Sequence, residues 1–519
     1  MKILSYKAGH DGHVAYLDKS KLQFSIEAEK DSWPRYEVVT PSLNLRAMEY
    51  VDTIPDVVAI SGWVKGFHSV NDPVEGGYYG EGVNTIVDRT QNFLGKEVRL
   101  FSSSHERSHI LGAYGMSPFP QGQACYALIW EGSLGCFYHI DENVHVTKIG
   151  SVMADPGNKY AFLYALADPS FPIHKGFFRY SDAGKLMALV SYGKPNSASD
   201  SDKELIDFIL SQKAILLDVD KGQLRDSPYF NIGVESEQFK NLTRNFSDTL
   251  FQRFHDFAKE HLTEKLPLLI AGGCGLNCDW NSEWHNTGLF SDIFIPPCTN
   301  DSGSAIGTAI DAQRHYTGEA KINWSVYAGE AFVHDKADLS EYDAFDLDYA
   351  QVSDFLKNQN VIAWVQGKYE IGPRALGNRS LIAAPFTKEM HARLNKIKNR
   401  EGFRPIAPIC LETDMDAYFE NHGPSPYMLH FQKVKTDTLK TITHVDGSAR
   451  AQTVSDATNP EMTKLLTQFK SDTGYGVLCN TSLNFNGTGF INRMSDLVKY
   501  ATNAGLDGFV VEDKFYKKK

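Results

Sequence analysis

Arginines and a lysine stand among glycines in the C-terminal third of the chain, where they could bind an anion. The densest segment runs from Gly367 to Pro385 and follows an apolar run, Val361 to Val365, that is typical of a buried strand. Glycines let backbone N–H groups approach a ligand closely, and guanidinium groups offer paired donors to phosphate or carboxylate oxygens. Alone, such a segment is more often a surface turn with solvated charges. Similar polar segments at 401–408, 444–452 and 478–484 favour one anion-binding pocket.

Two histidines one helical turn apart are candidate metal ligands. Ser104 is a favourable N-cap, and a helix that begins at His105 places His105 and His109 on the same face. With Glu106 they also spell His-Glu-x-x-His, the zinc peptidase motif in which the glutamate is the base. A peptidase needs a third ligand on a following helix, whereas the chain after Ile110 is predicted to form strands. A helical histidine pair without a metal is a further alternative.

The N-terminal residues predict a β-hairpin with strands at Lys2 to Tyr6 and Val14 to Leu17. Its turn contains His10, Asp11 and Gly12, and the backbone N–H groups of such a turn can hold an anion. Asp-Gly is also a standard signal for a plain type I′ hairpin. The neighbouring His10 favours a functional turn, since histidine can act as a general base near neutral pH.

A second hairpin of the same shape is predicted in the middle of the chain. Its strands are Cys125 to Trp130 and Cys136 to Ile140, and its turn contains Glu131 and Gly132. This is the one internal repeat that the sequence supports, and it predicts two related phosphate-binding turns.

A glycine run forms a third candidate turn. An apolar strand at Leu268 to Ala271 leads into Gly272 and Gly273, and a helix is predicted to follow. A ligand in such a turn can lie against the backbone and the helix N-terminus, within reach of Asn277. Many α/β proteins have such a turn, so it is weak support by itself.

Composition describes an ordinary folded protein. Its 519 residues are more than one hydrophobic core usually organises, so two or three domains are expected. The net charge is −12 and the only lysine-rich block is 517–519, which argues against a nucleic-acid or membrane-surface footprint. The 7 scattered cysteines suggest neither a disulfide framework nor a zinc knuckle. With no long apolar stretch, these features predict a cytoplasmic protein.

The segments at 368–380, 400–408, 444–452 and 479–484 resemble the C-terminal signatures of a known family. It is the family of O-carbamoyltransferases related to nodulation protein U and to the cephem hydroxymethyl carbamoyltransferases. The opening residues, around Gly9 to Gly12 and Glu27 to Tyr36, look closest to the cephem group.

The resemblance implies an α/β protein of two domains. Residues 1–335 would form an N-terminal actin-like (ASKHA) domain with duplicated β-hairpin phosphate loops, which transfers the carbamoyl group. Residues 345–519 would form a C-terminal α/β YrdC-like domain that makes carbamoyladenylate. Acidic composition and the lack of strong periodicity place the linker near 330–350.

The implied reaction is an ATP-dependent carbamoyl transfer from carbamoyl phosphate, through carbamoyladenylate, to the hydroxyl group of a small-molecule acceptor. Two highly charged anions come together only where fixed cations and backbone donors receive them. Pyrophosphate would leave the C-terminal domain with magnesium. The candidate ligands there are Lys368, Arg374, Arg379, Arg404, Arg450, Asn480 and Ser482.

For the N-terminal domain the resemblance implies a metal, iron(II) or alternatively zinc, on two histidines and a carboxylate. The implied ligands are His105, His109 and Asp301, the candidate base for the acceptor hydroxyl is His10, and Asp11 would orient it. The candidate nucleotide contacts are Gly12, Gly132, Gly272, Gly273 and Asn277. Glu131 stands where relatives outside the cephem group usually have aspartate, so its role stays open. Loops such as Trp63 to Gly82 would build the acceptor pocket.

Other classes of protein stay open at this point. A nucleotide-binding regulatory protein with an inert actin-like domain would explain the hairpins and the glycine run. It would leave the polar segments after residue 367 unexplained. A zinc peptidase would rest on the His-Glu-x-x-His motif alone, and a sugar kinase on the fold alone, which does not fix the chemistry.

Overall fold

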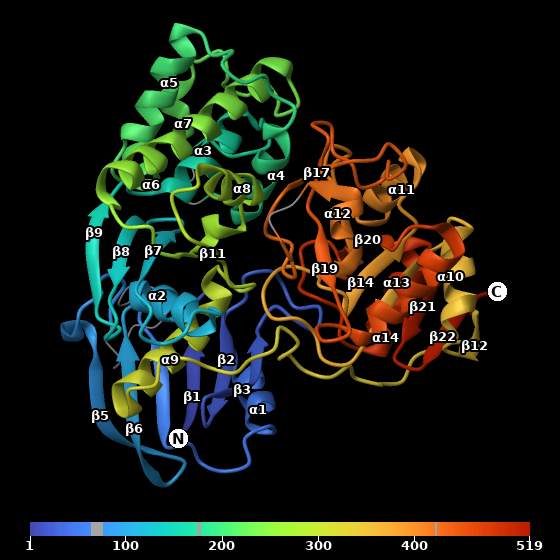
Figure 1. The fold of residues 1–519 in the computed structure, drawn as a ribbon, viewed down its shortest axis with the longest axis horizontal. Helices are drawn as coiled ribbons and strands as arrows, with labels where there is room; N and C mark the ends of the chain where they lie inside the picture. Colours follow the sequence, from blue (N-terminus) through green and yellow to red (C-terminus); the bar gives the residue numbers. More distant parts are fainter. Residues whose placement is uncertain (64–75, 174–177, 421–422) are drawn as a thin grey trace. The chain divides into compact units, whose positions relative to one another are not determined.

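The structure is a computed structural model that describes residues 1–63, 76–173, 178–420 and 423–519 (Figure 1). The chain divides into two compact units. The first unit comprises Met1–Gln121, Pro296–Thr443 and Gly447–Lys519, and the second comprises Gly122–Ile295 and His444–Asp446. The first unit contains an N-terminal sheet and a larger C-terminal sheet, and the second unit contains one sheet of its own.

The N-terminal sheet has the strand order β3-β2-β1-β4-β6-β5. Its strands are β1 (Lys2–Lys7), β2 (His13–Asp18), β3 (Lys21–Glu27), β4 (Val57–Ser61), β5 (Val87–Phe93) and β6 (Lys96–Ser103). Strands β1, β2 and β3 are antiparallel neighbours, whereas β4 runs parallel to both β1 and β6. The helices of this part are α1 (Pro41–Met48), α2 (His105–Met116) and α9 (Ser304–Thr317). A buried pair between Arg107 of α2 and Asp311 of α9, 2.6 Å apart, joins two of them.

The sheet of the second unit has the order β11-β10-β7-β8-β9. Its strands are β7 (Cys125–Trp130), β8 (Gly135–Ile140), β9 (Val146–Ser151), β10 (Leu268–Ala271) and β11 (Ile293–Phe294). Its helices are α3 (Pro156–Ala167), α4 (Tyr180–Val190), α5 (Asp200–Ser211), α6 (Ile215–Asp218), α7 (Glu237–His261) and α8 (Cys278–Thr287).

Both sheets are built in the same way, which confirms the predicted duplication. In each, a first strand pairs antiparallel with the second, the second pairs antiparallel with the third, and the first continues into parallel strands on its other side. The predicted hairpins are the first pair of each sheet, β1–β2 and β7–β8. This repeated order, together with the C-terminal sheet, confirms the predicted α/β class.

The C-terminal sheet has the order β12-β22-β21-β13-β14-β20-β15-β19. Its strands are β12 (Tyr342–Asp346), β13 (Val361–Val365), β14 (Arg379–Ala383), β15 (Ala407–Leu411), β19 (Gln452–Val454), β20 (Val477–Ser482), β21 (Gly508–Val511) and β22 (Lys514–Lys518). A small sheet joins β16 (Phe419–Glu420), β17 (Gln432–Val434) and β18 (Ser448–Ala449). The helices are α10 (Tyr349–Lys357), α11 (Lys388–Ile397), α12 (Met415–Tyr418), α13 (Pro460–Thr473) and α14 (Met494–Ala504). Alternate residues of the central strands bury side chains in two separate hydrophobic clusters, as expected for a sheet covered on both faces.

The segment between α9 and β12 lies along the edge of the N-terminal sheet before it reaches the C-terminal part. The N–H of Leu22 donates to Asn323 and the N–H of Ser25 donates to Ala328, so residues near 323–328 extend the β3 edge. Tyr369 then donates to the carbonyl of Glu330. The stretch in which the sequence placed the linker contains strand β12, while the domain limits at 335 and 345 remain a prediction. Among the residues that the structure describes, no helix has the length and apolar character needed to cross a membrane.

Candidate active site

The two predicted metal-ligand histidines lie on α2, which begins where the sequence predicted. Ser104 is the N-cap and its side chain accepts from the N–H of Arg107. His105 and His109 are both buried, and their Nε2 atoms are 3.2 Å apart. Asp301, in the turn before α9, places Oδ1 3.4 Å from Nε2 of His105 and 3.3 Å from Nε2 of His109.

This triad fits a metal ion. Ligand atoms about 2.1 Å from a shared ion lie about 3.0–3.5 Å from one another in tetrahedral or octahedral arrangements, which is the spacing found here. Two imidazoles and one carboxylate are a donor set that suits iron(II) or zinc. The structure therefore brings together His105, His109 and Asp301, which the sequence spreads over almost two hundred residues.

The second oxygen of Asp301 faces two other groups. Oδ2 lies 3.4 Å from Nζ of Lys7 and 3.5 Å from Nε2 of His10. Burial by itself would raise the pKa of Asp301, but the positive charges of His105, Lys7 and His10 hold it well below its ordinary value. Asp301 is thus an ionised carboxylate with one oxygen for the histidine pair and one for the hairpin turn.

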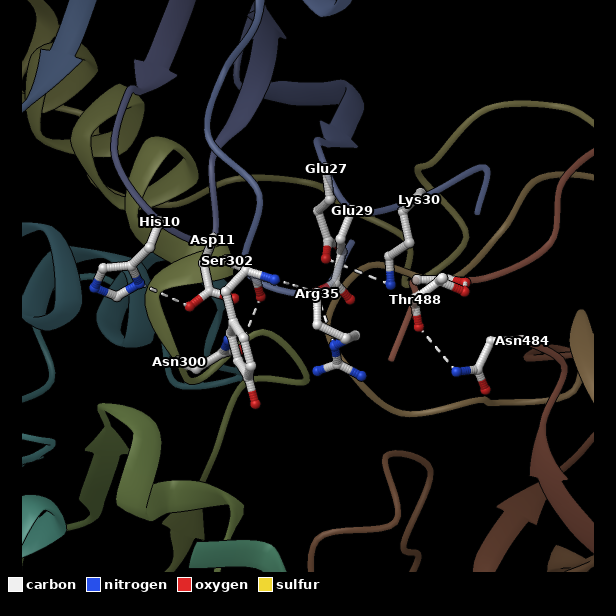
Figure 2. A network of polar contacts seen from close by, with 12 residues as sticks. His10, Asp11, Glu27, Glu29, Lys30, Arg35, Asn300, Ser302, Asn484 and Thr488 are labelled. Atoms are coloured by element: carbon white, nitrogen blue, oxygen red, sulfur yellow. Dashed lines mark hydrogen bonds and ion pairs between the residues drawn. The ribbon is translucent and has the colours of Figure 1, made fainter. Parts of the chain in front are cut away.

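The predicted base and its partner lie together in the first hairpin turn, as Figure 2 shows. Nδ1 of His10 lies 3.1 Å from Oδ2 of Asp11, and Nδ2 of Asn300 donates to Oδ1 of Asp11 at 3.4 Å. Burial lowers the pKa of His10, but the carboxylates of Asp301 and Asp11 outweigh it, so the net shift is upward. Gly12 allows the turn to close, because a Cβ there would lie 2.5 Å from the backbone nitrogen of Val39. The geometry is compatible with the predicted roles of His10 and Asp11.

Glu106 does not stand where a peptidase base would act. Its carboxylate accepts the backbone N–H of Gly80 at 2.5 Å, and its own N–H donates to the carbonyl of Tyr78. The side chain therefore holds the segment around Gly80, which lies between β4 and β5. Of the predicted acceptor loop between Trp63 and Gly82, residues 64–75 lie outside the described part of the chain.

In the second unit, the two predicted nucleotide turns meet. Gly272 has φ +100°, and a Cβ on it would lie 2.5 Å from the carbonyl oxygen of Trp130, so only glycine fits beside the β7–β8 turn. Gly132 lies in that turn, with its carbonyl accepting the N–H of Asn158 at the start of α3. Gly273 is exposed and has open space around it.

Asn277 has a structural contact of its own. Its side-chain oxygen accepts from the N–H groups of Asp279 and Trp280 and so caps α8. Its predicted contact with a nucleotide, like those of Gly132, Gly272 and Gly273, remains a prediction. The same holds for the role of Glu131, which belongs to the second unit.

The first C-terminal signature forms a loop between β13 and β14, residues 366–378, which we call the signature loop. The buried carboxylate of Glu370 lies inside it. Oε1 of Glu370 accepts the N–H groups of Leu376 at 2.6 Å, Asn378 at 2.8 Å and Arg379 at 3.2 Å. A single carboxylate thus holds three backbone N–H groups at the C-terminal end of the loop and fixes the loop's conformation.

Arg379 holds the signature loop rather than pointing at a ligand. Its guanidinium is completely buried, and it donates to Oδ1 of Asn492 and to the carbonyls of Gln366, Gly367 and Asn378, at distances of 2.7 to 3.0 Å. Burial lowers its pKa to about 10. We therefore leave Arg379 out of the proposed anion pocket.

Asn480 also contacts the signature loop. Its side-chain nitrogen donates to the carbonyl of Ala375 at 3.0 Å and to Oε1 of Gln452 at 2.9 Å, and Gln452 in turn donates to the carbonyl of Leu376 at 2.7 Å. Oδ1 of Asn480 is buried and has no hydrogen-bond partner within the described residues. Such an atom is costly unless a ligand or water meets it.

Four cationic side chains gather beyond α11, and we call them the cation cluster: Lys398, Arg400, Arg404 and Arg450. Nζ of Lys398 donates to the carbonyl of Ser482 at 2.6 Å and to Oδ1 of Asn484 at 2.6 Å, while the Ser482 hydroxyl donates to that same Oδ1. Burial, and after it the charges of Arg400 and Arg35, lower the pKa of Lys398 well below its ordinary value.

Arg400 lies at the centre of the cluster. Nε donates to Oδ1 of Asn395 at 2.7 Å, and Nδ2 of Asn395 donates to the carbonyl of Arg404 at 3.0 Å, so one buried asparagine shapes the 400–404 turn. Burial, followed by the charges of Arg404 and Arg450, lowers the pKa of Arg400 to about 9. Nε of Arg450 is buried without a hydrogen-bond partner among the residues described. Like charges held so close together are typical of a site for an anion.

Sequence reasoning found part of this cluster and missed the rest. Arg404, Arg450 and Ser482 were predicted, and Lys398, Arg400 and Asn484 were not chosen as ligands. The signal was present as two cationic residues at 398 and 400 in the turn after α11, and as Ser-x-Asn at 482–484 at the end of β20. Of the other candidates, Lys368 is exposed and Arg374 is half-buried at the middle of the signature loop.

Comparisons with known proteins identify the family of the chain. The family model "Carbamoyltransferase N-terminus" matches residues 41–310, and "Carbamoyltransferase C-terminus" matches residues 353–518. The chain is 46% identical over 520 residues to the 3'-hydroxymethylcephem-O-carbamoyltransferase of Streptomyces clavuligerus, covering 100% of this chain and 99% of that protein. It is 47% identical over 523 residues to the enzyme of the same name from Amycolatopsis lactamdurans, with the same coverage. It is 31% identical over 539 residues to nodulation protein U of Bradyrhizobium diazoefficiens, covering 94% and 93% of the two chains. The chain therefore belongs to the carbamoyltransferase family, as its signature segments predicted.

Proposed function

We propose that the protein is an ATP-dependent O-carbamoyltransferase that carbamoylates the hydroxymethyl group of a small molecule, with a hydroxymethyl cephem as the first candidate acceptor. The observation that carries the proposal is the cation cluster, in which burial, followed by the charges of Arg404 and Arg450, lowers the pKa of Arg400. Such mutual repulsion is relieved when phosphates bind. The acceptor class is suggested by the printed names of the two full-length relatives.

The adenylation step would take place at the cation cluster. Carbamoyl phosphate and water give carbamate and orthophosphate, and a carbamate oxygen then attacks the α-phosphorus of ATP. Carbamoyladenylate forms and pyrophosphate leaves, with Mg²⁺ balancing its charge. Arg400, Arg404 and Arg450 would hold the phosphates, while Lys398 donates to Ser482 and Asn484 and fixes the end of β20 beside them. The buried Oδ1 of Asn480 could accept from the carbamoyl NH₂ group.

The transfer step would use the first hairpin turn. The acceptor hydroxyl attacks the carbamoyl carbon of carbamoyladenylate, its proton passes to His10, and AMP leaves. Asp11 keeps the His10 ring in place through the 3.1 Å contact. A divalent metal held by His105, His109 and Asp301, which we propose to be iron(II), would polarise the carbamoyl carbonyl or hold the nucleotide phosphate.

The remaining assignments complete the proposal. Nucleotide binding is assigned to Gly12, Gly132, Gly272, Gly273 and Asn277, and the two domains to 1–335 and 345–519. A cytoplasmic location and the absence of nucleic-acid and membrane partners are carried over from composition. Lys368 and Arg374 stay candidates for carbamoyl phosphate, since Glu370 fixes the signature loop to which both belong.

The test is to supply ATP, Mg²⁺, carbamoyl phosphate and a 3-hydroxymethyl cephem, and to detect the O-carbamate by mass spectrometry. Arg450→Met should lower the yield of carbamate at least tenfold, because one half-buried guanidinium of the pocket is lost. The matched control is Arg253→Met, which removes an arginine from an exposed pair with Asp207. No carbamate from any hydroxymethyl acceptor, with pyrophosphate released, would refute the acceptor class but leave adenylation in place.

A further inference from the structure

A buried ion pair at the end of β3 holds one peptide of the signature loop. Glu27 and Lys30 are 3% and 0% exposed, and Oε2 of Glu27 lies 3.4 Å from Nζ of Lys30. The N–H of Gly372 donates to Oε1 of Glu27 at 2.6 Å, and Nζ of Lys30 donates to the carbonyl of Gly372 at 2.6 Å. We call Glu27, Lys30 and Gly372 the clasp. Figure 2 shows Glu27 and Lys30 facing each other beside the His10 turn.

The clasp has no part in either chemical step as proposed above. A buried ion pair is weak support for stability, because desolvation offsets much of its attraction. The effect of this pair is to fix the position of Gly372. Both polar groups of Gly372 are held at once, and Nζ of Lys30 also lies 3.8 Å from the centre of the Phe490 ring.

On its other side, Gly372 lies against the turn that carries a proposed metal ligand. Its φ is +86°, and a Cβ there would lie 2.4 Å from the carbonyl oxygen of Pro297 and 3.2 Å from Cα of Cys298. Pro297 and Cys298 begin the turn that reaches Asp301. A shift of Gly372 by even part of a bond length would therefore change the packing of the Asp301 turn.

Along the chain, Gly372 stands two residues before Arg374 in the signature loop. The bonds of Glu370 and Arg379 fix the loop on both sides, at 366–367 and at 376–379, so a shift at Gly372 falls on the short stretch between them, which contains Arg374. One pair of side chains thus sets the position of a loop proposed for adenylation and of a turn proposed for transfer.

We propose that Glu27 and Lys30 are positioning residues that couple the two half-reactions. This inference rests on the proposed function. With the clasp intact, the signature loop and the Asp301 turn keep their positions, and the carbamoyladenylate made at the C-terminal site reacts with the acceptor hydroxyl. Without the clasp, carbamoyladenylate still forms, but water attacks the carbamoyl carbon in place of the acceptor oxygen. AMP leaves in either case, and the carbamate released by water carries no acceptor.

The experiment compares the amount of pyrophosphate released with the amount of O-carbamate formed, in the full-length enzyme with a saturating hydroxymethyl cephem. Lys30→Met keeps the length of the side chain and removes the bond to Gly372. Its ATP–pyrophosphate exchange, which depends on carbamoyl phosphate, should stay within about threefold of the wild type. The amount of acceptor O-carbamate formed per pyrophosphate released should fall at least fivefold. Gly372→Ala, which crowds Pro297, should lower the same ratio if Lys30→Met fails to fold.

The matched control is Arg493→Gln. Arg493 pairs with Asp31, next to Lys30, at 2.9 Å, so this change loosens the same segment away from Gly372. The control should keep the ratio of the wild type. Equal losses of exchange and of carbamate in Lys30→Met, an unchanged ratio, or equal uncoupling by Arg493→Gln would each overturn the inference. A wild type that releases no pyrophosphate with carbamoyl phosphate would refute the proposed function instead.

Discussion

Replacement of Glu27 by glutamine should remove a pH dependence of stability that the wild type carries. Burial of the Glu27 carboxyl is the largest influence on its pKa, Lys30 opposes it, and nearby Glu29 adds to it. Together they raise the pKa from its ordinary value of 4.5 to about 7. Glutamine can still accept the N–H of Gly372 at this position, but it cannot titrate.

The sign follows from proton binding. In the unfolded chain Glu27 loses its proton near pH 4.5, whereas in the folded chain it keeps the proton until about pH 7. The folded state therefore binds more protons in this window, and the wild type loses stability as pH rises through it. At 1.36 kcal/mol per pH unit, the loss amounts to about 3 kcal/mol. This loss of stability should be complete by pH 8, and it should be absent from Glu27→Gln.

The assay is urea unfolding of both proteins at several pH values from 5 to 8, followed by tryptophan fluorescence. Every other titrating group is shared, so only the difference between wild type and variant matters. The free energy of unfolding of Glu27→Gln, relative to the wild type, should rise by about 2–3 kcal/mol between pH 5 and pH 8. A constant difference, or a relative gain by the wild type, would refute the reasoning.

Other predictions follow from the two sites. Arg379→Met should lower the free energy of unfolding by roughly 2–5 kcal/mol, measured by urea titration, because it strands the carbonyls that its guanidinium satisfies; a change under about 1 kcal/mol would contradict the structural role. His109→Ala should lower bound iron or zinc, measured by elemental analysis after dialysis, at least tenfold, and retention of stoichiometric metal would contradict the triad. His10→Asn should keep pyrophosphate release that depends on carbamoyl phosphate and slow carbamate formation about 100-fold or more; loss of adenylation with transfer intact would contradict its role as base.

Local structure was predictable where short-range rules decide it. Ser104 is the N-cap and α2 begins at His105, as capping preferences predicted, and both hairpins follow from strand-forming residues on either side of turn residues. The strand Leu268–Ala271 and the helix near 350–356 were found for the same reason. Strand β12, in contrast, has mostly exposed side chains and lies at the edge of its sheet, so it gave no hydrophobic pattern.

The candidate site was predictable only as a set of residue types. The pair His105 and His109 followed from helical spacing, Asp301 came from the resemblance, and the fold alone brings the distant Asp301 to the histidines. Arginine in a glycine-rich loop was taken as a ligand, although Arg379 satisfies its donors on the loop itself. The sequence cannot separate a guanidinium that binds phosphate from one that binds backbone carbonyls, because both need the same polar surroundings. The clasp was invisible for a similar reason, since Glu27 and Lys30 meet Gly372 only through the tertiary fold.

The central claim is that this chain makes carbamoyladenylate at its cation cluster, and its most direct measurement is pyrophosphate release from ATP without any acceptor. The account predicts that release requires carbamoyl phosphate and Mg²⁺, and that Arg400→Met lowers it at least tenfold at fixed substrate concentrations. Release that is independent of carbamoyl phosphate, or no release with metal supplied, would contradict the claim.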